Sequence, residues 1–120
     1  MSSILPVLNL LAASAGTIGG VVAVFQPAAM SKSSQITPGE LFYARMYAVR
    51  AFPLGIVAGI LPFFYRGPVV ASVLFTASLV QVADVVIGAG KKDTGMMMGA
   101  SIAAILHFIT GYAIQGAAAV

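Results

Sequence analysis

Long apolar stretches alternate with short polar segments along the whole chain. The apolar stretches run over about residues 4–25, 41–64, 68–89 and 95–117. Each is long enough to cross a bilayer as a helix, which takes about 20 residues. A sheet edge exposed to lipid would leave backbone groups without hydrogen bonds, so we expect no strands. The pattern predicts an all-α protein, a four-helix transmembrane bundle that forms a single domain over residues 1–120.

The polar segments between the stretches carry a helix-start signal and a charge bias. Pro38 precedes the second stretch, and proline is favoured in the first turn of a helix. Lys32, Lys91 and Lys92 fall in the first and third connections, whereas Arg66 falls in the second. Basic residues prefer the cytoplasmic side of a membrane. We therefore expect the first and third connections in the cytoplasm and both termini on the opposite side.

Composition supports a membrane protein and narrows its chemistry. Of the 120 residues, 60% are hydrophobic and 8% are charged, whereas a soluble domain carries about 25% charged residues. The chain has no cysteine and one histidine, so we expect no disulfide, no metal site and no cofactor. No basic run is long enough to bind nucleic acid. The expected partners are the lipid bilayer and a small hydrophobic ligand, and assembly into a homo-oligomer or a larger membrane complex stays open.

Three ionisable side chains lie inside the apolar stretches. Arg50 falls in the second stretch, Asp84 in the third and His107 in the fourth. An ionisable group at membrane depth costs several kcal/mol, so it normally faces the bundle interior and has a partner. We expect these three residues to share one polar site, with Asp84 within ion-pair reach of Arg50 or Arg45.

Helix geometry places further polar side chains at the same site. With a rise of about 1.5 Å per residue, Arg50 lies roughly 13 Å and His107 roughly 18 Å from the side that carries the lysines. Gln81 lies level with Arg50, and Tyr47 shares its helix face. We expect a polar wedge with His107 at its floor. Arg50, Gln81 and Tyr47 would bind a ligand there, and His107 and Asp84 would act as catalytic acid–base groups.

A pair of glycines and a proline affect the expected shape of the wedge. Gly16 and Gly20 lie at the same depths on the first helix and would let that helix close the wedge. Pro53 has no N–H group to donate to the Val49 carbonyl, which would leave an acceptor free beside the site. The GxxxG pairs favour packing within the chain over a dimer face.

Simpler interpretations remain for the same residues. Asp84 could form a purely structural ion pair, since buried pairs often fix register rather than perform chemistry. His107 could be a neutral core histidine with a hydrogen bond to a backbone carbonyl. The run Met96-Met97-Met98 is more typical of adaptable packing than of a metal site.

The order of the polar residues resembles a known pattern. The segment Tyr47-Ala48-Val49-Arg50-Ala51-Phe52-Pro53-Leu54-Gly55, followed by Gln81-Val82-Ala83-Asp84 and then His107, is similar to a family of small four-helix membrane proteins of bacteria and fungi. That family has no established activity and is distantly DoxX-like. Arg50, Asp84, His107 and Gly55 match its pattern, whereas Ala51 stands where the family usually has an acid. The resemblance implies a four-helix fold.

Three functions are compatible with these residues. The first is the binding of a small lipid-soluble molecule, with or without acid–base isomerisation, cyclisation or hydration by Asp84 and His107. The second is a small proton-coupled transporter that uses one of the same two groups. The third is a structural accessory subunit of a larger membrane complex.

The charge bias generates a topology prediction. Because the chain has no native cysteine, single cysteines at Ser2 and Lys91 can be labelled without background. We expect a membrane-impermeant maleimide to label Ser2→Cys from one side of sealed vesicles and Lys91→Cys from the other. Labelling of both positions from the same side would contradict the topology.

Overall fold

Four long helices and one short helix make up the computed structural model, which describes residues 3–118. The long helices are α1 (Ile4–Phe25), α3 (Pro38–Phe64), α4 (Pro68–Gly90) and α5 (Thr94–Gln115). The short helix α2 (Pro27–Ser31) lies in the first connection, between α1 and α3. Residues 3–118 contain no strand. The all-α four-helix fold predicted from hydropathy is therefore confirmed.

Local capping explains where the helices begin. The Thr37 hydroxyl accepts a hydrogen bond from the Glu40 N–H at 3.1 Å, so α3 starts a turn before its apolar stretch. The Asp93 carboxylate accepts one from the Met96 N–H at 3.1 Å and starts α5 in the same way. The connection before α4 contains Gly67 with a φ of 108°, a backbone conformation that favours glycine.

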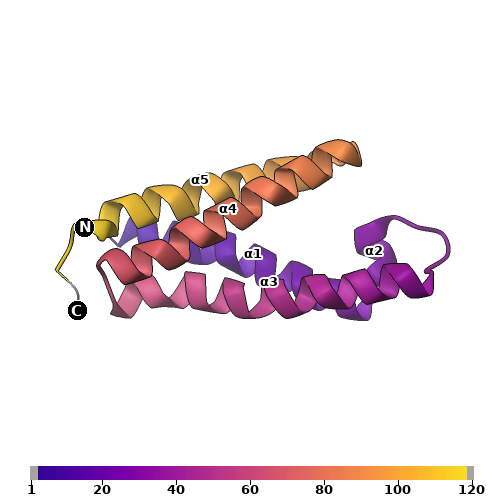
Figure 1. Cartoon of the computed structure of the whole chain (residues 1–120), viewed down its shortest axis with the longest axis horizontal. Coiled ribbons are helices and arrows are strands. Elements are labelled where there is room, and N and C mark those ends of the chain that lie inside the picture. Colours follow the sequence, from indigo (N-terminus) through magenta and orange to yellow (C-terminus); the bar gives the residue numbers. More distant parts are fainter. Residues whose placement is uncertain (1–2, 119–120) are drawn as a thin grey trace.

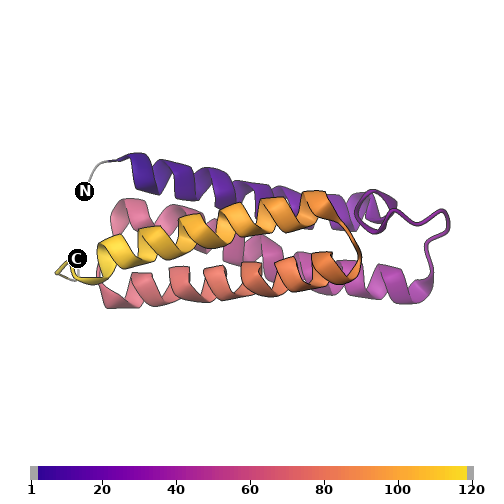
Figure 2. The same cartoon turned by 90° about the horizontal axis from the view of Figure 1, so that it is seen from above.

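The long helices pack as two pairs. α1 lies along α3, and α4 lies along α5, with much less contact between the pairs. Figures 1 and 2 show the start of α1 and the end of α5 at one end of the bundle, with α2 and the α4–α5 turn at the other. Towards this second end the α4–α5 pair diverges from α3 (Figure 1). We call the first end the closed end and the second the open end.

Apolar packing and one backbone hydrogen bond hold the closed end together. The core cluster joins Ala58 of α3 to Leu74 of α4 and Ile114 of α5. The Gly67 N–H donates to the Ile114 carbonyl at 3.1 Å, which ties the α3–α4 turn to the end of α5. The two pairs are therefore joined where the chain crosses from α3 to α4.

Close approach within each pair depends on particular glycines. A Cβ atom at Gly55 of α3 would collide with the Thr17 side chain and lie 2.9 Å from the Ala13 carbonyl oxygen of α1. A Cβ at Gly111 of α5 would lie 3.0 Å from the Phe75 ring of α4. At Gly99, by contrast, a Cβ would have no atom within 4 Å apart from its chain neighbours and the backbone of its own helix. Only some of the glycines in GxxxG spacing therefore serve packing within the chain.

The outer surface is apolar along all four long helices. Large exposed side chains include Leu11, Val49, Leu79 and Ile105. All four helices are long and apolar enough to cross a membrane, with mean hydropathies between 1.6 and 2.0 over their best windows. These properties are those of an integral multi-pass membrane protein.

The glycine contacts generate a stability prediction. We expect Gly55→Ala to lower the free energy of unfolding in bicelles by about 1–3 kcal/mol, because the added methyl group meets the backbone of α1. Gly99→Ala is the matched control and should cost nothing, because its position is open. Equal losses in the two variants, measured by denaturant titration, would show that α1 does not approach α3 this closely.

Candidate functional site

A small cavity lies between the two helix pairs. Its polar lining comes from Tyr47, Arg50, Gln81, Asp84 and His107. The structure therefore brings together all five residues that the sequence singled out. The rest of the lining is apolar or glycine and includes residues of α1, so all four long helices contribute.

The volume of the cavity limits what can enter it. Its volume is about 20 Å³, which is room for about one water molecule. The polar end group of a larger molecule fits such a space, whereas a whole drug-sized ligand does not. The polar site that the sequence predicts is therefore a small cavity.

The carboxylate and the guanidinium in this region differ in exposure. Arg50 Nη2 lies 3.6 Å from Asp84 Oδ1, with 54% of the arginine side chain exposed and 11% of the aspartate side chain. This distance is within ion-pair range but is too long for a hydrogen bond. Arg50 donates no hydrogen bond to any of residues 3–118. Its N–H groups are thus available to an acceptor outside the chain. Arg45 forms no ion pair within the same range.

Glycines of α1 make room for the two uncharged polar groups. Gln81 Nε2 would lie 3.9 Å from a Cβ at Gly16, and the Tyr47 hydroxyl 3.2 Å from a Cβ at Gly19. Both side chains therefore reach from their own helices to the surface of α1. The Tyr47 ring also lies 6.0 Å from the Arg50 guanidinium carbon, the outer limit of a cation–π contact.

His107 has a partner that the sequence analysis did not identify. The residue is 2% exposed, and its Nδ1 lies 2.6 Å from Oδ1 of Asn9 on α1. Asn9 is fully buried, and its Nδ2 donates to the Ala58 carbonyl of α3 at 2.8 Å. The expected core-histidine contact was with a backbone carbonyl, whereas the actual partner is a side-chain amide. No hydrogen bond joins His107 to Asp84 within the described chain.

The sequence contains a feature that indicates a role for Asn9. It is a strongly polar side chain within an apolar stretch, and polar groups in a membrane span face other helices. Because asparagine carries no charge, a prediction from ionisable residues alone does not include it.

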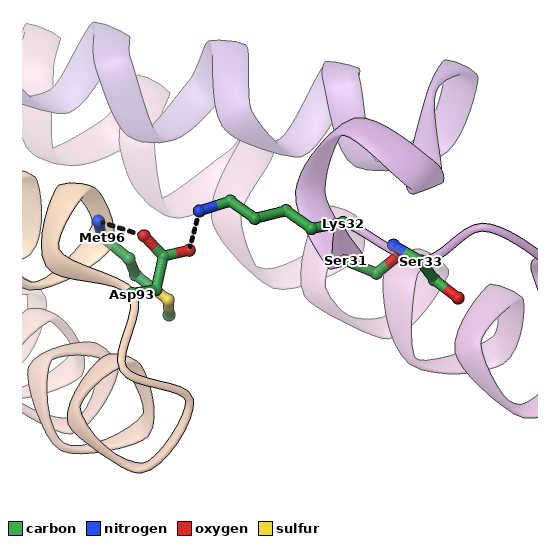
Figure 3. A network of polar contacts seen from close by, with 5 residues as sticks. All are labelled: Ser31, Lys32, Ser33, Asp93 and Met96. Carbon is green, nitrogen blue, oxygen red and sulfur yellow. Dashed lines mark hydrogen bonds and ion pairs between the residues drawn. The ribbon is translucent and has the colours of Figure 1, made fainter.

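An ion pair crosses the open end of the bundle. The Lys32 ammonium, just after α2, lies 3.2 Å from the Asp93 carboxylate in the α4–α5 turn (Figure 3). The Met96 N–H and then the Lys32 ammonium hold the pKa of the Asp93 carboxyl below its ordinary value. Because folding lowers this pKa, the stabilisation is present above the unfolded value of about 3.9 and is lost as pH falls through the folded value. Lys32 is largely exposed, so the pair adds little stability.

No group of three or more His, Cys, Asp or Glu side chains is placed to hold a metal ion within residues 3–118. Arg50 supplies hydrogen-bond donors, Asp84 supplies acceptors, and Gln81 supplies both.

Comparisons with protein-family models, with curated proteins and with solved structures found no match to this chain. The similarity to the small four-helix family remains a resemblance in a few residues.

Proposed function

We propose that this protein is a multi-pass membrane protein that binds a small lipid-soluble molecule by its polar end between the two helix pairs. Arg50 donates a hydrogen bond to an oxygen atom of the ligand, and Gln81 and Tyr47 lie beside that polar end. The apolar part of the ligand extends towards lipid. The observation that carries this proposal concerns Arg50. Its side chain is half exposed beside the cavity, and its N–H groups donate to no acceptor within residues 3–118.

A purely structural ion pair would have a different geometry. Such a pair needs close contact and further hydrogen bonds to offset the loss of hydration. The Arg50–Asp84 distance of 3.6 Å and the exposure of the guanidinium do not fit that description. An acceptor from a ligand would complete the hydrogen bonding of Arg50, while Asp84 balances its charge.

The helix geometry supports a site at membrane depth. At a rise of about 1.5 Å per residue, Arg50 lies about 18 Å along α3 from Pro38, and Asp84 about 9 Å along α4 from Gly90. The ion pair therefore lies inside two helices that are long and apolar enough to cross a membrane, away from the ends of both. A lipid-soluble molecule is the class of ligand that reaches such a site from the membrane.

Binding requires only the contacts that are present. An acid–base step on the ligand, such as isomerisation or cyclisation, would further require a substrate atom within hydrogen-bond reach of Asp84 or His107. We therefore put binding first and keep that chemistry as its extension.

Arg50→Gln provides the test, with Arg45→Gln as a matched control on the same helix. Both substitutions remove one positive charge, but Arg45 does not line the cavity. Native mass spectrometry of protein extracted from its membrane should show a bound small molecule in the wild type and in Arg45→Gln. Occupancy should fall at least about tenfold in Arg50→Gln, since a hydrogen bond to a charged group is worth about 1.5–3 kcal/mol.

Two outcomes would contradict the proposal. One is a wild-type protein that carries no small molecule into the gas phase at any lipid-to-protein ratio. The other is equal occupancy in the two arginine variants, which would place the molecule away from Arg50.

A further inference from the structure

The Ala58 carbonyl is left open by the sequence of α3 itself. In a helix this carbonyl would accept from the N–H four residues later, but that residue is Pro62, which lies inside α3 and has no N–H. The Asn9 amide of α1 supplies the missing donor at 2.8 Å. A carbonyl oxygen can only accept, so the NH₂ group of Asn9 must face Ala58.

This contact fixes the other half of the amide. With its NH₂ group on Ala58, Asn9 presents Oδ1 to Nδ1 of His107 at 2.6 Å. An amide oxygen can only accept, so Nδ1 must carry a hydrogen and donate it. In the neutral ring Nε2 then carries none and is an acceptor.

We infer that Asn9 holds His107 in the tautomer protonated on Nδ1, so that the cavity offers Nε2 as an acceptor for a hydroxyl group. Nε2 has no hydrogen-bond partner within residues 3–118, and His107 lines the cavity. The space of about 20 Å³ fits one water molecule or one hydroxyl group.

The inference about the hydroxyl group deepens the proposed function and rests on it. The assignment of the tautomer is independent of the proposed function. Arg50 would donate a hydrogen bond to an oxygen of the ligand, and Nε2 would accept one from a hydroxyl group of the ligand. The ligand class is then a lipid-soluble molecule with a hydroxyl group at its polar end. Asn9 is a positioning residue, because it acts on the ligand only through His107.

Nitrogen NMR reads the tautomer directly, because the chain has one histidine. With ¹⁵N-histidine protein in phosphatidylcholine liposomes near neutral pH, we expect a protonated Nδ1 and an unprotonated Nε2. Asn9→Leu removes the acceptor and should abolish the predominance of this form. Ser78→Ala is the control, because it removes a different buried interhelical bond, from Ser78 Oγ to the Ala104 carbonyl at 2.8 Å, and should leave the tautomer unchanged.

The wild-type spectrum alone can overturn the tautomer assignment. A proton on Nε2 and none on Nδ1 would do so, whether or not Asn9→Leu folds. An Asn9→Leu spectrum identical to the wild type would remove the role of Asn9.

1-Decanol and decyl methyl ether test the hydroxyl group in the same liposomes. The two molecules share an oxygen and an alkyl chain, but only the alcohol can donate. We expect the alcohol to shift the Nε2 resonance and the ether to leave it in place. If a signal from a water proton at Nε2 persists when the alcohol is present, the donor is water instead of the alcohol. Nε2 is an acceptor in that case too.

Equal shifts with both molecules, or no shift and no water signal, would overturn the acceptor role. Failure of the proposed function has a different signature. In that case Arg50→Gln would leave small-molecule occupancy unchanged, while the Nδ1–H tautomer of the ligand-free protein would still be observed.

Discussion

Inside α3, the Ala58 carbonyl has no hydrogen-bond donor within its own helix. Pro62 cannot donate to Ala58, and Asn9 of α1 takes its place at 2.8 Å. An open carbonyl in the dry interior of a bundle costs free energy, so its donor has a fixed position. The same amide then bonds His107 of α5 at 2.6 Å. A single buried side chain thus links three helices and both helix pairs.

This link explains why the bundle has one closed and one open end. The Asn9 contacts, the core cluster around Leu74 and the Gly67–Ile114 hydrogen bond join the pairs. Beyond them the pairs diverge (Figure 1), and the cavity lies between them with Arg50 at its side. The proposed ligand site depends on this arrangement, because the joined helices fix the positions of the polar groups that line the cavity.

Hydropathy alone predicted the four helices, because lipid forces a continuous apolar run for each span. The polar residues that line the cavity were also predictable, because ionisable groups in a span face the bundle interior and helix geometry places Tyr47 and Gln81 near them. The Asn9 link was not found, although Pro53 prompted the same reasoning that applies to Pro62. The GxxxG spacing could not show that Gly55 lies against another helix and Gly99 does not, because that difference comes from tertiary packing.

A double-mutant cycle on Asn9 and His107 measures whether their hydrogen bond couples α1 to α5. Asn9→Leu, His107→Phe and the double variant would be unfolded by denaturant titration in bicelles. Hydrogen bonds between membrane helices contribute about 0.6 kcal/mol on average and up to about 1.7 kcal/mol. A short, fully buried bond between α1 and α5 should therefore give a coupling free energy of about 1 kcal/mol. Losses that simply add, with no coupling, would contradict the link between the two helix pairs.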